Sequence, residues 1–368
     1  PLAIAAGLPL AASLDDGRWD SPEPGIARWR MQVYSPGAKT LALEFSRFSL
    51  PADAALWLYD LSGQLIQGPY TAADQTPEGK LWTAMVPSDT VVLELRVPQA
   101  AQKSASLQLG QVQHGAVNIA KAFTGSTSGA CNVDVACTAG DSWRDEIRAV
   151  GRYTVTVPDT ATTSTVYLCT GQLVNNVRQD STPYFLTANH CDTRLAPSSV
   201  VVYWNYQNTS CGGGTNNLSQ NQSGATLKAY DGQSDFTLLQ LNQTPPSAYN
   251  VYYTGWDASG STPTSGVDIH HPEGDVKKIS TFTTPASQAE VTISTNTSQT
   301  VSAWAVQWSQ GTTEEGSSGS GLLNQNHQLV GVLSGGNGAC SSSNPSVNNG
   351  GTDYFGRTAV AWQANVCS

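Results

Sequence analysis

The chain alternates short apolar runs with clusters of Pro, Gly, Asn, Asp and Ser, a pattern typical of strands separated by turns. In the first third, the expected strands are Met31–Tyr34, Thr40–Phe45, Ala55–Tyr59, Leu81–Val86 and Thr90–Val97. Further along they are Tyr153–Val157, Ser164–Leu173, Tyr184–Ala188, Ser199–Tyr206, Asp235–Leu241, Ala303–Gln307, Leu329–Ser334 and Phe355–Trp362. Helical periodicity is weak, and Trp143–Val150 is the best short candidate. The pattern therefore predicts an all-β protein.

Composition narrows the possible functions. Charged residues make up 12% of the 368 positions, about half the share of roughly 25% in an ordinary soluble domain. The formal net charge is -10 and no cluster of Lys and Arg occurs, which argues against a nucleic-acid partner because phosphates need a basic surface. No uninterrupted apolar run approaches the roughly 18 residues of a membrane span, so no membrane partner is expected.

The seven cysteines divide the chain, because none precedes Cys131. Residues 1–121 are expected to form a β-sandwich, Ala122–Ala130 an exposed linker, and the remainder two β units separated near Pro245. The apolar start, Pro1–Ala12, is either the tail of a signal peptide or the first strand. No Cys-x-x-Cys pair occurs, so disulfides and an oxidising compartment are favoured over structural zinc. No metal or cofactor is expected.

A Gly-Ser-Ser-Gly-Ser-Gly run at residues 316–321 is the first candidate for chemistry. Such a run can be a flexible loop. Here it lies between an expected strand and the apolar pair Leu322-Leu323. Glycines that flank a serine allow a tight turn with converging backbone N–H groups, which is the geometry of an oxyanion hole.

A serine nucleophile needs a base and an orienting carboxylate. His190 follows the apolar run Tyr184–Ala188 and directly precedes Cys191, so a disulfide could hold it rigidly. Asp235 begins another apolar run. The order His190, Asp235, Ser318 is that of chymotrypsin-like proteases.

Several motifs together make the resemblance specific. They are Cys169-Thr-Gly-Gln-Leu173, Leu186-Thr-Ala-Asn-His-Cys191, Ser234-Asp-Phe-Thr-Leu-Leu239, Gly316-Ser-Ser-Gly-Ser320, Cys131-Asn-Val-Asp-Val-Ala-Cys137, Val201-Val-Tyr-Trp-Asn-Tyr-Gln207, Ile269-His-His-Pro272 and Asp353-Tyr-Phe-Gly-Arg357. Over roughly residues 125–362 the chain resembles the bacterial lysyl endopeptidases, which have a chymotrypsin-like double β-barrel. Residues 1–121 resemble the propeptide of such enzymes.

The resemblance implies a role for each matching residue. Ser318 would be the nucleophile, His190 the general base and Asp235 its orienting acid, with the N–H groups of Gly316 and Ser318 as the oxyanion hole. His190 and Asp235 would belong to a first barrel at 122–245, and Ser318 and Asp353 to a second at 246–368. The implied disulfides are Cys131–Cys340, Cys137–Cys211 and Cys169–Cys191, which leaves Cys367 over.

Specificity for lysine requires a carboxylate in the pocket, because an unpaired buried ammonium is costly. Asp353, Glu314 and Glu315 are the candidates, and Asp353 matches the family position for lysine preference. After residue 121 the only lysines are Lys228, Lys277 and Lys278, as would suit a secreted lysyl protease.

Removal of the propeptide is expected to use the same preference for cleavage after lysine. Lys121 lies where the cysteine-free part gives way to the linker, so cleavage between Lys121 and Ala122 would release the propeptide. Ser317 stands where pancreatic-type relatives have an Asp that receives the new terminal ammonium, so activation should come from release of an inhibitory propeptide. The propeptide would also assist folding, because barrels rich in non-local contacts fold slowly.

The expected protein is thus a secreted bacterial zymogen, exported through the periplasm and monomeric, that acts on proteins or peptides. Three alternatives stay open. The pocket could accept Arg as well as Lys; the chain could be an inactive homologue that serves as a binding module; or His270, His271, Glu273 and Asp275 could bind a metal. The metal alternative is weak because adjacent histidines cannot easily ligate one ion.

Overall fold

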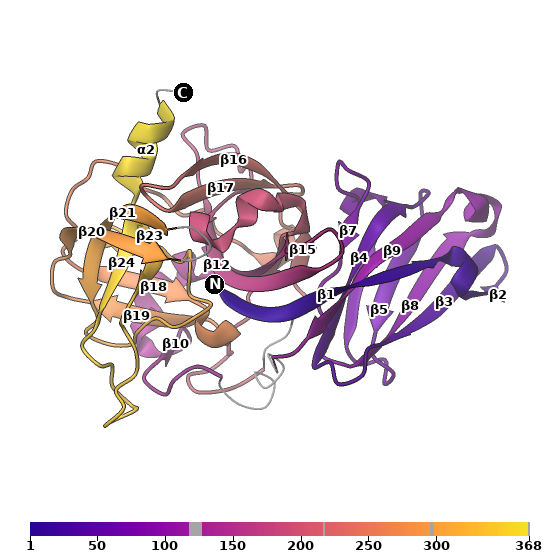
Figure 1. Cartoon of the computed structure of the whole chain (residues 1–368), viewed down its shortest axis with the longest axis horizontal. Coiled ribbons are helices and arrows are strands. Elements are labelled where there is room, and N and C mark those ends of the chain that lie inside the picture. Colours follow the sequence, from indigo (N-terminus) through magenta and orange to yellow (C-terminus); the bar gives the residue numbers. More distant parts are fainter. Residues whose placement is uncertain (118–126, 216–217, 295–297, 367–368) are drawn as a thin grey trace.

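The computed structural model describes residues 1–117, 127–215, 218–294 and 298–366. Lys121, Ala122 and Cys367 lie outside these ranges. The described chain is built mainly from antiparallel strands, arranged as a sandwich followed by two barrels (Figure 1). None of its described helices has the length and apolar character needed to cross a membrane.

The amino-terminal β-sandwich consists of two sheets that face each other across one apolar core. One sheet has the order β2 (Arg18–Glu23), β3 (Ile26–Tyr34), β8 (Thr90–Pro98), β5 (Ala55–Tyr59) and β6 (Ile66–Tyr70). The other contains β1 (Leu2–Ser13), β9 (Ser106–Gly115), β4 (Thr40–Ser49) and β7 (Leu81–Trp82). Alternating inward residues such as Trp29, Phe45 and Leu93 fill the core, as two half-buried sheets require.

The first barrel follows from a chain of antiparallel pairs. In pairing order its strands are β16 (Ala225–Asp231), β17 (Phe236–Leu241), β13 (Tyr184–Ala188), β12 (Ser164–Val174), β11 (Val150–Pro158), β14 (Val201–Trp204) and β15 (Asn221–Ser223). The chain passes directly from β15 into β16 through Gly224, whose positive φ of 86° suits glycine. Fully buried Tyr153, Phe185 and Trp204 pack inside.

The second barrel has the order β10 (Val133–Asp134), β19 (Lys278–Phe282), β18 (Gly266–His270), β22 (Gly321–Asn324), β23 (Leu329–Gly336), β24 (Thr352–Arg357), β21 (Ser298–Gln307) and β20 (Ser287–Ser294). A bridge between Thr281 and Gln310, just beyond β21, closes the curved sheet on β19. A shared core that includes Val150, Leu186, Ile269 and Leu323 joins the two barrels. The prediction of an all-β protein with a double β-barrel after a sandwich is confirmed.

Two expectations near the chain ends are resolved by the structure. The apolar segment at Pro1–Ala12 is a strand, since β1 spans Leu2–Ser13. The strand expected over Phe355–Trp362 is correct only as far as Arg357, because β24 covers Thr352–Arg357 and helix α2 covers Thr358–Val366. The segment after Arg357 is rich in alanine, the best helix former, which outweighs its apolar alternation. The short helix expected near Trp143 is α1 (Arg144–Ala149).

Candidate active site

His190 and Asp235 are brought together by the pairing of β13 with β17. Ala188 lies opposite Phe236, so the residues just beyond these two strand ends are neighbours. The His190 ring Nδ1 lies 2.6 Å from Asp235 Oδ2, and the His190 backbone N–H donates to Oδ1 at 2.9 Å. Because a carboxylate only accepts hydrogen bonds, this contact suits the tautomer with a proton on Nδ1, which has Nε2 as its acceptor. Both side chains are buried, at 2% and 0% exposure.

Gln299 is a residue of this site that the sequence did not reveal. Its amide Nε2 donates to Asp235 Oδ1 at 3.0 Å, and its Oε1 accepts from Asn189 Nδ2 at 3.3 Å. The glutamine lies at the start of β21 in a polar stretch rich in Ser, Thr and Asn. No local pattern distinguishes it there, because its partners are more than 60 residues away in the chain.

Ser318 lies beside β12 and the turn that carries His190. Its backbone carbonyl accepts from Thr170 N–H at 2.9 Å and lies 3.8 Å from Cys191 Sγ. Gly319 packs so closely on the strand before His190 that an added Cβ would lie 2.8 Å from Ala188 N. Its φ of +84° also requires glycine, so this position fixes the loop against β13.

The neighbouring serines are engaged elsewhere. The Ser317 hydroxyl is fully buried and lies 2.7 Å from His270 Nδ1, and Ser320 donates to Asp268 Oδ2 at 3.0 Å. Ser318 is half-buried, with a hydroxyl that makes neither of these contacts. Of the three serines, Ser318 is therefore the one available as a nucleophile.

The backbone of the same loop presents two N–H groups for an oxyanion. The N–H groups of Ser317, Gly319 and Ser320 donate to the carbonyls of Glu314, Leu333 and Ser317. Within the described ranges, the N–H groups of Gly316 and Ser318 have no such acceptor. These are the two N–H groups that the family resemblance assigns to an oxyanion hole, and that assignment stays a prediction.

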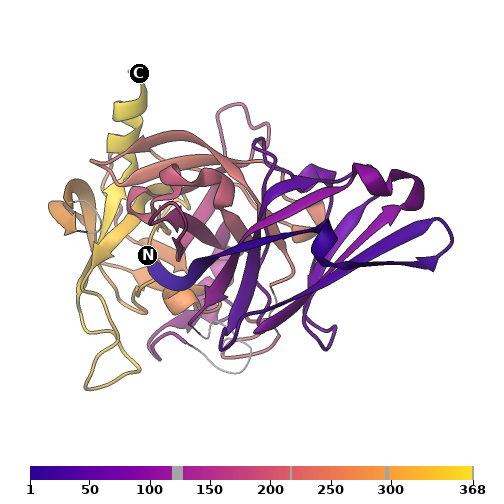
Figure 2. The same ribbon diagram turned by 45° about the vertical axis from the view of Figure 1, so that its right-hand side comes forward.

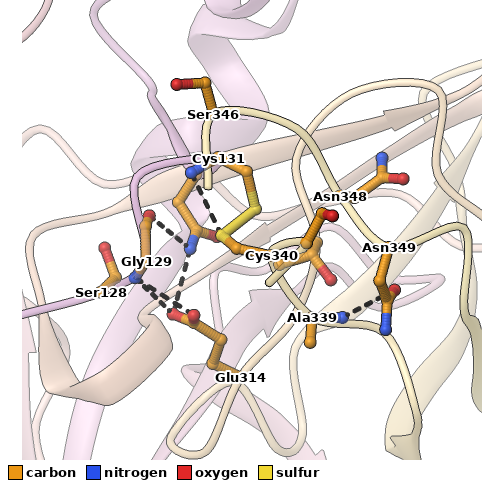
Figure 3. The surroundings of a disulfide bond; sticks show 12 residues. Ser128, Gly129, Cys131, Glu314, Ala339, Cys340, Ser346, Asn348 and Asn349 are labelled. Carbon is orange, nitrogen blue, oxygen red and sulfur yellow. Dashed lines mark hydrogen bonds between the residues drawn. A yellow bond between two sulfur atoms is a disulfide. The ribbon is translucent and has the colours of Figure 1, made fainter. Parts of the chain in front are cut away.

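Three disulfides hold the segments around the site. They are Cys131–Cys340, Cys137–Cys211 and Cys169–Cys191, the pairs that the family resemblance implies. The last joins β12 to the turn that carries His190. The first lies beside Glu314, whose carboxylate accepts from Gly129 N–H at 3.1 Å and from Asn132 Nδ2 at 3.0 Å (Figure 3).

Asp353 is a buried carboxylate on β24, with 1% of its surface exposed. It accepts from Trp308 Nε1 at 2.7 Å, Thr313 Oγ1 at 2.8 Å and Gly338 N–H at 3.0 Å. Burial raises the pKa of Asp353, and these hydrogen bonds oppose the rise. A Cβ at Gly336 would lie 2.2 Å from its Oδ1, so glycine leaves room for the carboxylate.

The charge balance distinguishes Asp353 from the other two candidate anions. No ion pair joins Asp353 to a cation within the part of the chain that the structure describes. Glu314 already binds the backbone that leads into the first barrel, and Glu315 is exposed. Of the three candidate anions, Asp353 is thus the one that is buried and has no ion pair in the described part of the chain.

The residues of the metal alternative do not converge. His270 is hydrogen-bonded to Ser317 and Ser280 hydroxyls, and His271 Nδ1 to the Asp275 carbonyl oxygen. Burial lowers the pKa of His270 to about 3, so its ring is neutral. Throughout the described ranges, no group of three or more His, Cys, Asp or Glu is placed to hold a metal ion.

Known proteins resemble this chain in sequence and in structure. The family model described as lysyl endopeptidase, C-terminal domain, matches residues 125–356. A lysyl endopeptidase from Pseudomonas aeruginosa is 30% identical over 377 aligned residues, which cover 97% of this chain and 79% of that protein. The active form of the Rv3671c protease from M. tuberculosis aligns with 66% of this chain and 87% of its own, at 17% identity and a TM-score of 0.41. An inactive form aligns with 66% and 97%, at 16% identity and a TM-score of 0.38.

Proposed function

Because the chain belongs to the lysyl endopeptidase family, we propose that it cleaves peptide bonds after lysine, with Ser318 as the nucleophile. It is a serine endopeptidase. One observation supports the lysine preference. The buried Asp353 carboxylate accepts three hydrogen bonds and has no cationic partner within the described ranges. A lysine ammonium would supply the missing positive charge, with the aliphatic stem in the pocket.

The proposed chemistry is acyl transfer through Ser318. Its Oγ bonds to the scissile carbonyl carbon while the hydroxyl proton moves to His190 Nε2, and Asp235 holds the ring and stabilises the imidazolium. The carbonyl oxygen, now negative, accepts from Gly316 and Ser318 N–H. His190 then gives the proton to the leaving amine, and water releases the acyl group by the reverse sequence of transfers.

The proposed domain organisation places a propeptide at 1–121 and the two protease barrels at 122–245 and 246–368, with β10 (Val133–Asp134) crossing over to pair with the second barrel. We take Lys121–Ala122 as the bond that the enzyme cuts in itself. In the uncleaved chain, Ser128 and Gly129 already contact Asp275 and Glu314, and the Ser318 loop is already formed. This supports activation by loss of an inhibitory propeptide. The three disulfides suit export to an oxidising compartment.

A peptide-library digest read by mass spectrometry tests the specificity. Wild type should cut after Lys, and Ser318→Ala should cut nothing. Equal cleavage after Arg would support the broader pocket. Absence of any cleavage, together with no labelling by an organophosphate serine reagent, would contradict a protease and favour a binding module.

Amino-terminal sequencing tests the self-processing. Wild type should begin at Ala122, whereas Ser318→Ala and Lys121→Gln should stay near full length. Each is to be expressed without other proteases. If Ser318→Ala still begins at Ala122, another protease does the cutting.

A further inference from the structure

Strand β1 belongs to the sandwich in sequence but also extends the first barrel. It pairs antiparallel with β12, with Leu2 opposite Leu168 and Gly7 opposite Ser164. Its other edge pairs with β9, so one continuous sheet runs from the barrel into the sandwich. Figures 1 and 2 both show the amino end of β1 among the barrel strands and its remainder along the sandwich.

The amino end of β1 points toward the reactive loop. Leu2 lies opposite Leu168, and a Cβ built on Gly316 would lie 3.2 Å from Leu168 Cδ2. The next residues of β12 are Cys169, disulfide-bonded beside His190, and Thr170, bonded to Ser318. Residues from Ala3 to Gly7 then lie progressively farther along β12 from that loop. The strand thus runs away from Ser318 in the amino-to-carboxyl direction.

The side chains of β1 alternate as a bound peptide's would. Leu2 and Ile4 are buried in a core shared with Val166, Leu168 and Tyr203 of the barrel and with Trp82 and Met85 of the sandwich. Ala3 is exposed between them, and a register shift between Ala3 and Ala5 then changes the alternation, so that Ala6 is exposed and Gly7 is buried. Strand addition of this kind gains affinity from main-chain hydrogen bonds and specificity from every second side chain.

We propose that the edge of β12 from Ser164 to Leu168 binds the part of a peptide that follows the scissile bond, and that β1 fills this edge in the uncleaved chain as a strand-shaped inhibitor. This inference rests on the proposed protease function. A substrate whose scissile carbonyl meets Ser318 would have to leave along β12 in the direction that β1 takes. The edge suits an extended segment with aliphatic side chains two residues apart, as Leu2 and Ile4 are.

The consequence is that cutting the linker is insufficient for activity. After cleavage the sandwich would still be held by β1, because Leu2 and Ile4 lie in the apolar core that the barrel and the sandwich share. Extended peptides could enter only when β1 leaves. A small reagent that needs only the Ser318 hydroxyl would not require that step.

A reversible cross-link tests this on the full chain. Ala6 lies opposite Thr165 on β12 and also opposite His114 on β9. Facing positions in an antiparallel pair have Cα atoms about 4.5–5.5 Å apart, which suits a disulfide. The double variant Ala6→Cys with Thr165→Cys ties β1 to the barrel. The matched control, Ala6→Cys with His114→Cys, ties it to its own sandwich.

The readout is cleavage of an internally quenched peptide with at least four residues after lysine, beside organophosphate labelling of Ser318. After the linker is cut, the barrel-locked variant should cleave the peptide at least a hundredfold more slowly than the control, and mild reduction should restore it. Labelling should be similar in both. Equal peptide cleavage with the cross-link intact would overturn the inference, whereas absence of labelling in wild type would overturn the protease function instead.

A second pair of variants keeps the inference testable if the locked chain does not fold. In a Lys121→Gln background, Leu2→Asp places a charge in the shared core, and Ala3→Asp places the same charge on the exposed side of β1. Leu2→Asp should raise cleavage of the extended peptide at least tenfold, and Ala3→Asp should leave it unchanged. No increase in a folded Leu2→Asp chain would contradict the inference.

Discussion

Asp235 holds His190 at two points: its Oδ2 lies 2.6 Å from the ring Nδ1, while its Oδ1 accepts the backbone N–H at 2.9 Å. One carboxylate thereby fixes both the position of the residue and the tautomer of the ring. The arrangement depends on the register between β13 and β17, since His190 follows the end of β13 and Asp235 precedes the start of β17.

Asp235→Asn should lower kcat at neutral pH by roughly 10³–10⁴-fold with little change in the fold. An amide nitrogen facing Nδ1 removes the acceptor that selects the tautomer with a free Nε2. Steady-state kinetics on a lysyl peptide, beside circular dichroism, measure the effect. A kcat within threefold of wild type would exclude the proposed role of Asp235.

Gln299→Ala should reduce kcat by roughly 10–150-fold and leave KM nearly unchanged, because it removes a hydrogen bond to a charged group worth about 1.5–3 kcal/mol. The loss should act through Asp235, so Gln299→Ala should have little further effect in an Asp235→Asn background. Thr300→Ala is the matched control, since Thr300 contacts Thr292 on the neighbouring strand. Equal losses in both single variants would indicate a general effect on β21.

Replacing Cys169 and Cys191 by serine should inactivate the enzyme at temperatures where it is still folded. Their disulfide has a sequence separation of 22 residues and carries the turn that holds His190. Closing a loop of that size is worth roughly 3 kcal/mol on the loop-entropy model. Activity and unfolding are to be followed in parallel on heating. Full activity up to the unfolding midpoint would show that the bond does not position the base.

Lys277→Met should stabilise the protein at neutral pH and lose this benefit in alkali. Lys277 is fully buried, its Nζ donates to the Ile147 carbonyl at 2.7 Å, and burial lowers its pKa from 10.5 to about 7. The unfolded chain then binds more protons between about pH 7 and 10.5, so wild-type stability should rise with pH through that window. Methionine does not titrate, so the variant should lack this rise of stability with pH. Denaturant unfolding at pH 7 and pH 10 measures the free energy of unfolding of wild type and variant. If that free energy changes with pH equally in both proteins, Lys277 is not the group responsible.

Alternation and turn residues predict the strands well because both signals are local. Tyr184–Ala188 is the same in the sequence analysis and in the structure, and the expected strand at Asp235–Leu241 differs by one residue. The order of His190, Asp235 and Ser318 could also be read from motifs. The contact of Gln299 with Asp235 could not, because it depends on how the second barrel meets the first.

The structure of Pro1–Ala12 could not be predicted from the local sequence either. Pro1–Ala12 is apolar enough for either a signal peptide or a strand, and only the partner decides between them. That partner, β12, begins at Ser164, so no local window contains the pair. Helix α2 was missed for a different reason: alternating apolar residues and helix-forming alanines conflict there, and propensity prevails.

The proposed role of Asp353 in binding lysine is tested most directly by comparing a lysyl substrate with a neutral one. The ratio of kcat/KM for a lysyl peptide to that for the same peptide with norleucine should be large in wild type. In Asp353→Asn it should fall at least a hundredfold, since losing one partner of a buried charge pair typically costs about 3–5 kcal/mol. Cleavage of the norleucine peptide should persist, which shows that the nucleophile loop is intact. An unchanged ratio in a folded, organophosphate-reactive Asp353→Asn enzyme would contradict the account.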